Sequence, residues 1–145
     1  MNIEIDERIN FSKTGGTIRR TTKLIVLHHA CMDGDAYKVH KIHLSFGWLG
    51  IGYHYYITKD GKVWRGRPQP LQGSHCKGYN AKSLGICLEG DFRKEKPTEK
   101  QIHSLKELVS YLKKVYPTIE NVYNHKDLFP TECPIVNLKE IINES

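Results

Sequence analysis

Short apolar runs rich in β-branched residues recur along the chain and predict buried strands. Residues 24–27 form four consecutive apolar positions, too few for a helix, and residues 84–88 repeat the pattern. Residues 53–58 and 62–65 are aromatic and β-branched and are separated by an Asp-Gly pair, which predicts a hairpin. A further short strand is expected near Val122.

Amphipathic stretches lie between these runs and predict helices. Apolar residues recur at helical intervals from Thr98 to Pro117, and Gln101 stands three residues after Thr98, as in a capping box. Asp35 is placed to cap a shorter helix that reaches Phe46, and residues 138–142 predict a last short helix. Strands alternating with helices predict an α/β fold in which helices pack on the faces of a single sheet.

A chain of 145 residues is expected to form one domain. We interpret residues 1–22 as an N-terminal extension packed on a domain formed by residues 23–145. No window approaches the roughly 18 consecutive apolar residues of a membrane helix, so no membrane segment is predicted. Residues 1–8 carry three acids and no apolar stretch, which indicates synthesis in the cytoplasm without a signal peptide, or secretion if a leader has been removed.

The net charge of +6 favours an anionic partner, and most of the basic excess lies in residues 1–75. Nucleic acid, a lipid surface and a carboxylate-rich cell-wall polymer are all anionic, so net charge does not choose among them. The basic residues are scattered and form no helix-turn-helix or Arg-rich aromatic pattern, so nucleic-acid binding is not expected. The four cysteines include no Cys-x-x-Cys pair, which argues against a zinc ribbon or a thioredoxin-type site.

Candidate metal ligands follow the predicted strands. His28 and His29 end the first strand, and His125 and Cys133 follow the last. Two imidazoles and a thiolate form a donor set that zinc prefers, and three protein ligands leave a fourth position open, as in catalytic sites. A single histidine is more often structural, however, and spacing alone does not select these residues. The pair His40-x-x-His43 on the predicted helix is interpreted as a packing and surface feature.

Five segments, in this order, resemble the motifs of the zinc-dependent N-acetylmuramoyl-L-alanine amidases of the phage-lysozyme type. These enzymes share a fold with the peptidoglycan-recognition proteins, and the similarity extends over residues 23–143. The segments are LHHA at residues 27–30, GWLGIGYHY at 47–55, GSHCKGYN at 73–80, LGICL at 84–88 and HKDLFPTECP at 125–134.

The resemblance implies a single domain with a central, mainly mixed sheet, about three flanking helices and one zinc ion. It assigns the metal to His28, His125 and Cys133, and strand alternation agrees that only one of the two adjacent histidines faces the site. Tyr53 matches a tyrosine that lies beside the metal in the family. Thr131 falls where phage enzymes often carry lysine and active recognition proteins often carry threonine, and its hydroxyl is a candidate catalytic group that donates a hydrogen bond to the oxyanion, more weakly than a lysine would.

The family's equivalent of residues 73–80 lines the groove that holds the peptide stem of the substrate. On this basis His75, Lys77 and Asn80 are candidate substrate-binding residues. No glutamate occurs in a metal-proximal motif as a general base, so water activated by the metal, assisted by Tyr53, is the simplest mechanism.

The predicted function is hydrolysis of the amide bond between N-acetylmuramic acid and L-alanine in bacterial peptidoglycan, by a monomer that acts on the cell wall after release from the cell. One alternative is a muropeptide-recognition module without activity, which the presence of Cys133 disfavours. Another is binding of nucleic acid or of a polymerase through the basic N-terminal half.

Overall fold

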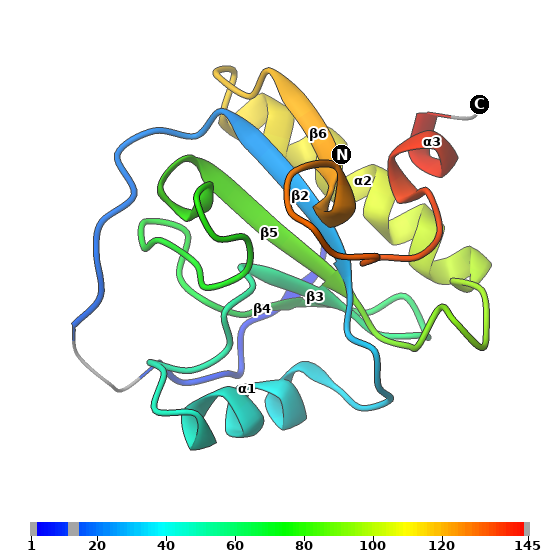
Figure 1. Cartoon of the computed structure of the whole chain (residues 1–145), viewed down its shortest axis with the longest axis horizontal. Helices are drawn as coiled ribbons and strands as arrows, with labels where there is room; N and C mark the ends of the chain where they lie inside the picture. The colour runs from blue at the N-terminus through cyan, green and yellow to red at the C-terminus, as the bar shows by residue number, and fades with distance from the viewer. Residues whose placement is uncertain (1–2, 12–14, 144–145) are drawn as a thin grey trace.

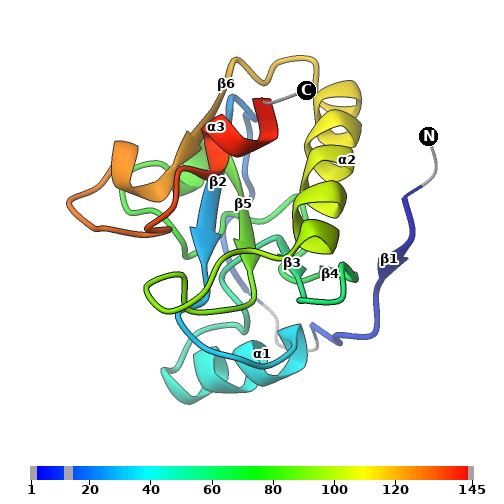
Figure 2. The ribbon, with the colours of Figure 1, turned by 90° about the vertical axis from the view of Figure 1, so that its right-hand side faces the viewer.

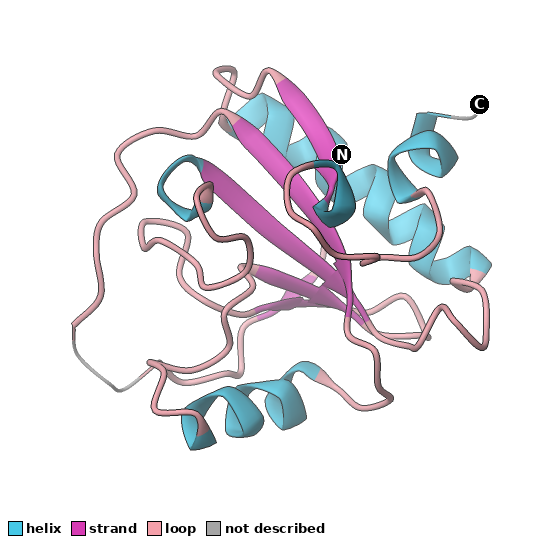
Figure 3. Ribbon diagram, in the orientation of Figure 1, coloured by secondary structure: helices cyan, strands magenta, loops and turns pink. Residues whose placement is uncertain are grey.

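A six-stranded mixed sheet forms the centre of the molecule (Figures 1 and 3). The computed structural model describes residues 3–11 and 15–143. Across the sheet the strand order is β1-β4-β3-β5-β2-β6, and only the β3–β4 pair is antiparallel. The strands are β1 (Ile5–Asp6), β2 (Leu24–His29), β3 (Tyr55–Ile57), β4 (Val63–Arg65), β5 (Ser83–Leu88) and β6 (Asn121–Asn124).

Three α-helices flank this sheet in the described part of the chain: α1 (Ala36–Ser45), α2 (Glu99–Val115) and α3 (Leu138–Asn143). Figure 2 shows α2 and α3 beside the sheet and α1 beyond the end of β2. Two short 3-10 helices adjoin the strands: η1 (Asn80–Lys82) directly precedes β5, and η2 (His125–Asp127) directly follows β6. The predicted α/β class, with a mixed sheet and three helices, is therefore confirmed.

Alternation along the strands gives the sheet two apolar faces. On one face, Ile25 and Leu27 of β2 and Ile86 of β5 are fully buried against Leu105 and Leu108 of α2. Because neighbouring side chains on a strand point to opposite faces, the next residues in sequence face away from α2. The second face is covered by a smaller cluster that includes Ala36, Val39, Ile51, Tyr56 and Cys87.

Both long helices begin with the caps that the sequence predicts. Thr98 accepts a hydrogen bond from the Gln101 backbone N–H at 3.0 Å, and the Gln101 side chain accepts one from the Thr98 N–H at 3.0 Å. Asp35 accepts a hydrogen bond from the Lys38 N–H at 3.0 Å at the start of α1. The helix interpretations are correct to within one or two residues.

Strand β1 was not predicted. Ile5 and Asp6 pair in parallel with Val63 and Trp64 at the edge of the sheet, within the segment that we interpreted as an extension. Two paired residues are too few to produce a recognisable pattern of hydrophobicity. Residues 1–2 and 12–14 of that segment lie outside the described residues, and the boundary at residue 22 stays a prediction.

Among the described residues, no helix combines the length and apolar character needed to cross a membrane.

Candidate metal centre

The pairing of β2 with β6 brings the two candidate histidine ligands together. Leu27 pairs with Asn124, so the residues that follow them, His28 within β2 and His125 at the start of η2, lie side by side. Their rings lie with centroids 4.5 Å apart. Parallel neighbouring strands present their carboxyl ends at the same edge of a sheet, and that edge is a common location for binding sites in α/β folds. Strand register therefore explains how residues 97 positions apart meet.

Cys133 reaches the same edge on the loop that follows η2. The Lys126 N–H donates to the Cys133 carbonyl at 2.7 Å, which folds this loop back on its own start. The Cys133 Sγ atom lies 4.0 Å from Nδ1 of His28 and accepts a hydrogen bond from the His29 backbone N–H at 3.4 Å. One ligand atom from each of His28, His125 and Cys133 lies within 4.8 Å of the other two.

These residues fit a bound metal ion. Within the described part of the chain, Nδ1 of His125 is buried and has no hydrogen-bond partner, an arrangement that is costly for a polar atom unless another group satisfies it. Two imidazole nitrogens and one sulfur match the ligands of a catalytic zinc site, in which donor atoms lie about 3.5 Å apart. The observed spacings, 4.0 Å between the Cys133 sulfur and His28 Nδ1 and at most 4.8 Å within the group, are wider than in a loaded site.

Burial sets the protonation states of the three groups. It lowers the pKa of His28 well below the ordinary value, and it also lowers the pKa of His125. Both imidazoles are therefore neutral near pH 7 and hold a free lone pair. Burial raises the pKa of the Cys133 thiol to about 11, so this group keeps its proton until a cation displaces it.

His29 points away from this cluster, as strand alternation predicts. Its Nδ1 atom accepts a hydrogen bond from the Phe92 backbone N–H at 3.1 Å, and its ring stacks on Phe92 with centroids 5.5 Å apart. Of the adjacent pair, only His28 faces His125 and Cys133.

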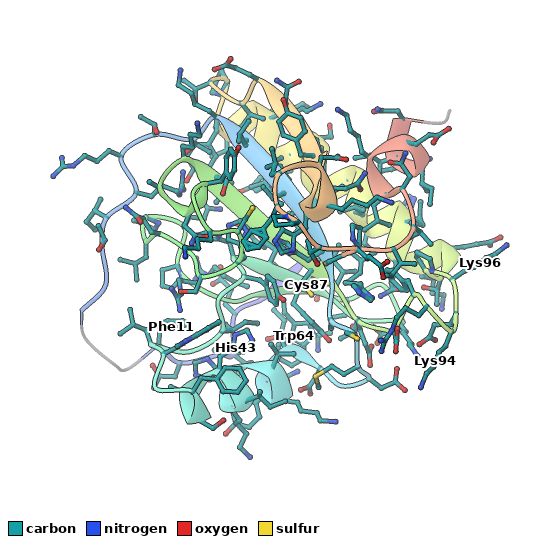
Figure 4. The ribbon with its side chains drawn as sticks, in the orientation of Figure 1. Phe11, His43, Trp64, Cys87, Lys94 and Lys96 are labelled. Carbon is teal, nitrogen blue, oxygen red and sulfur yellow. The ribbon has the colours of Figure 1, made fainter. Side chains whose placement is uncertain are left out.

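Tyr53 lies beside the candidate metal ligands. Its ring centroid is 5.0 Å from that of His28 and 5.8 Å from that of His43 on α1. Burial raises the pKa of the Tyr53 phenol well above its ordinary value, and the neighbouring Cys87 and Cys133 sulfurs raise it further. The phenol is therefore a hydrogen-bond donor at neutral pH. In Figure 4, His43 lies on α1 and Cys87 near the centre of the sheet.

Thr131 lies on the loop that carries Cys133. Its hydroxyl oxygen accepts a hydrogen bond from the Cys133 backbone N–H at 3.3 Å. Because that contact uses a lone pair, the hydroxyl proton is available to a group in the cleft.

The three candidate substrate-binding residues have different surroundings. Lys77 is exposed. Asn80 shapes the loop, because its Oδ1 atom accepts hydrogen bonds from the backbone N–H groups of His75 and Cys76, both at 3.0 Å. The ring of His75 is buried, and its nitrogens lie 2.9 Å from His28 Nε2 and 3.2 Å from Ser83 Oγ. A direct contact of these residues with substrate stays a prediction.

A cleft of about 530 Å³ opens over the candidate ligands, a size typical of small-molecule sites. A second hollow of about 510 Å³ adjoins it, and both hollows are lined by Trp48, His75, His125 and Thr131. Arg93 also lines the first cleft, although its guanidinium is held by Asp91 at 2.7 Å. The sequence held no signal for Arg93, because its proximity to the site arises from the loop after β5.

An α/β sheet with a His-His-Cys cluster in an open cleft defines a candidate metal-dependent hydrolase. Residues 18–135 match the family model described as N-acetylmuramoyl-L-alanine amidase. This match spans well over half of the chain, which therefore belongs to the N-acetylmuramoyl-L-alanine amidase family.

Individual relatives agree with this assignment. The endolysin of Klebsiella phage KP32 is 38% identical over 137 residues, covering 88% of this chain and 90% of the relative. The solved structure of the amidase LysC from Clostridium intestinale URNW superimposes with a TM-score of 0.90 at 40% identity, over 97% of this chain and 95% of that one. Drosophila PGRP-LB superimposes with a TM-score of 0.81 at 26% identity, over 97% and 93% of the two chains.

The protein is thus a peptidoglycan-cleaving amidase with the fold shared by the peptidoglycan-recognition proteins. The resemblance, fold class and activity predicted from the sequence are confirmed. The described residues include a His-His-Cys group that could bind a metal ion.

Proposed function

We propose that His28, His125 and Cys133 bind one zinc ion and that the enzyme uses it to hydrolyse the bond between N-acetylmuramic acid and L-alanine. The observation that carries this proposal is the convergence of donor atoms from His28, His125 and Cys133 within 4.8 Å of one another. Among the described residues, His125 also has a buried Nδ1 atom without a hydrogen-bond partner. When bound, a zinc ion supplies activation of water and polarisation of the scissile carbonyl. The protein groups around it hold and orient the reactants.

Tyr53 donates a hydrogen bond to the reacting oxygens. Its raised pKa keeps the phenol protonated at neutral pH, so it acts as a donor that stabilises developing negative charge. Its ring is held by contacts with His28 and His43. A group fixed before the reaction loses little entropy when the transition state forms.

Thr131, on the loop that also carries Cys133, is the candidate donor to the oxyanion. The Cys133 N–H fixes the hydroxyl oxygen, and the hydroxyl proton is directed at a substrate atom. A neutral hydroxyl stabilises an oxyanion less than the ammonium group of a lysine would. We therefore expect Thr131 to contribute to the rate as a secondary group.

The adjoining hollow holds the peptide stem. Its lining includes Lys77, Asn80, Phe129 and Thr131. Lys77 is exposed and carries an ammonium group, so it can pair with a carboxylate of the stem. In this proposal the enzyme works as a monomer and reaches the cell wall after leaving the cell that makes it.

Two measurements on purified protein test this proposal. Zinc content by elemental analysis should be about one ion per chain, and free amino groups should appear when the enzyme digests purified peptidoglycan. A chelator should abolish that release, added zinc should restore it, and Cys133→Ser should abolish activity and weaken zinc retention. Binding of muropeptides without release of amino groups would instead establish a recognition module. A shift of duplex DNA in electrophoresis would favour the nucleic-acid alternative.

A further inference from the structure

His75 connects the candidate metal ligand His28 with the hydroxyl group of Ser83. Nε2 of His28 lies 2.9 Å from Nδ1 of His75, and Nε2 of His75 lies 3.2 Å from Oγ of Ser83. The two rings are nearly perpendicular, at 88°. The exposed fractions are 1% for His28, 7% for His75 and 0% for Ser83. Because all three are buried, their polar atoms depend on one another for hydrogen bonds.

The direction of these hydrogen bonds is set at the Ser83 end. The Ser83 hydroxyl donates to the backbone carbonyl of Tyr79 at 2.7 Å. A carbonyl can only accept, so the single hydroxyl proton points at Tyr79 and the Ser83 oxygen accepts from the Nε2–H of His75. A buried imidazole avoids a second proton, because an unpaired buried charge is costly. Nδ1 of His75 is therefore an acceptor.

The same reasoning continues to His28. Since Nδ1 of His75 accepts, Nε2 of His28 must carry the proton that joins the two rings. The lone pair of His28 is then on Nδ1, which lies 4.0 Å from the Cys133 sulfur. The opposite pattern of protons would place a hydrogen on Nδ1 of His28 and block the metal position.

We propose that Ser83 and His75 are positioning residues that hold His28 in the tautomer whose Nδ1 lone pair faces the metal. This inference rests on the proposed function for the identity of the bound ion. It gives His75 a different role from the substrate contact expected from the sequence. In metal sites, groups that hydrogen-bond to a ligand histidine fix its tautomer and orientation.

The ring of His75 packs closely against the backbone of Gly85. A Cβ atom at Gly85 of β5 would lie 2.6 Å from Cγ of His75, so glycine makes the space in which the ring lies against the sheet. Ser83 is two residues earlier on the same strand and therefore on the same face. The His75 N–H also donates to Asn80 Oδ1 at 3.0 Å, which fixes the backbone that carries the ring.

The tautomers of the wild-type protein test this proposal without any substitution. Nitrogen-15 NMR of the imidazoles in the metal-free protein should show both His28 and His75 protonated at Nε2 and unprotonated at Nδ1. Protonation of His28 at Nδ1 would overturn the proposal. This readout is independent of catalysis, and failure of the wild-type protein to bind zinc would count against the proposed function alone.

Ser83→Ala tests the origin of the tautomer, with Ser104→Ala as the matched control. Ser104 also donates to a backbone carbonyl, that of Gly61 at 2.5 Å, but it lies on α2 and lines no part of the cleft. We expect Ser83→Ala to give mixed tautomers at His75 and His28 and to weaken zinc binding by about 10- to 100-fold in a chelator competition. Ser104→Ala should match the wild type. An unchanged tautomer and affinity in folded Ser83→Ala would refute the role of Ser83.

Discussion

Nδ1 of His43 accepts a hydrogen bond from the backbone N–H of Gly52 at 2.9 Å, one residue before Tyr53. One turn earlier on α1, Nδ1 of His40 accepts from the Ile51 N–H at 3.0 Å. These two histidines, which the sequence suggested were packing and surface features, fasten the segment that carries Tyr53 to the helix. Each bond requires an unprotonated Nδ1 atom, so the attachment depends on pH.

Acid should destabilise the fold through His43 and through His54, whose Nδ1 atom accepts a hydrogen bond from the Gly85 N–H. Burial lowers the pKa of His43 to about 4 and that of His54 to about 3, below the ordinary 6.5 that applies in the unfolded chain. Below pH 6.5 the unfolded chain binds more protons at these two histidines than the folded chain does. Their contribution to the free energy of unfolding is therefore complete above pH 6.5 and is lost as the pH falls toward 4. The melting temperature of the metal-free protein should fall over this interval.

The variant His43→Asn isolates one part of this effect, because the Asn Oδ1 atom can accept the Gly52 bond without titrating. Its melting temperature should vary less with pH between 6.5 and 4 than that of the wild type. His103→Asn is the control, since His103 is exposed and pairs with Glu107 on the same helix. Identical pH profiles for His43→Asn and the wild type would show that His43 does not carry the effect.

Replacing Tyr53 with Phe should slow turnover while the bound metal is retained. The ring contacts with His28 and His43 survive the change, whereas the hydrogen bond to the transition state is lost, so we expect the rate to fall by about 10²-fold or more. Turnover on purified peptidoglycan and zinc content should be measured together. Tyr56→Phe is the control, because its hydroxyl donates to the Gly34 carbonyl at 2.8 Å, away from the cleft. A normal rate in Tyr53→Phe would remove this residue from the mechanism.

Thr131→Val and Thr131→Ser separate the hydroxyl of Thr131 from its shape. The valine variant has a similar volume but no donor, and we expect its rate to fall by up to about tenfold, the scale of one neutral hydrogen bond. The serine variant keeps the hydroxyl that contacts the Cys133 N–H, and its rate should remain near that of the wild type. Equal losses in both variants would indicate that the Thr131 hydroxyl does not stabilise the oxyanion.

Zinc binding should release about one proton per ion near pH 6.5. Burial holds the pKa of Cys133 at about 11, so its thiol is protonated before binding and deprotonated afterwards. His28 and His125 contribute none, because their lowered pKa values leave them neutral. Calorimetric titrations in buffers of different ionisation enthalpy measure this number, and a value near zero would contradict thiolate coordination. Zinc affinity should accordingly rise as the pH increases through this range.

The elements with strong periodicity could be predicted from the sequence, whereas contacts between distant segments could not. The helix after Thr98 and the strand that ends at His29 carry complete local patterns, and both are found where predicted. The approach of His125 to His28 follows from the register of β6 on β2, which periodicity does not contain. The family resemblance, and not periodicity, predicted that His28 and His125 lie together as metal ligands.

The role of the buried histidines also depends on tertiary contacts. His54 accepts from the Gly85 N–H at 3.1 Å, and His29, His40 and His43 accept from backbone N–H groups in the same way. The donors of these bonds lie 9 to 63 residues from the rings, so composition shows an excess of histidine without showing its cause. A histidine that accepts from the backbone cannot be distinguished by sequence from one that faces a metal.

The most direct test of the metal site is X-ray absorption spectroscopy at the zinc edge on the zinc-loaded protein. We predict two imidazole nitrogens at about 2.0–2.1 Å and one sulfur at about 2.3 Å, with the sulfur absent in Cys133→Ser. A wild-type spectrum without sulfur, or a sulfur that persists in Cys133→Ser, would contradict the assignment of His28, His125 and Cys133 as the ligands.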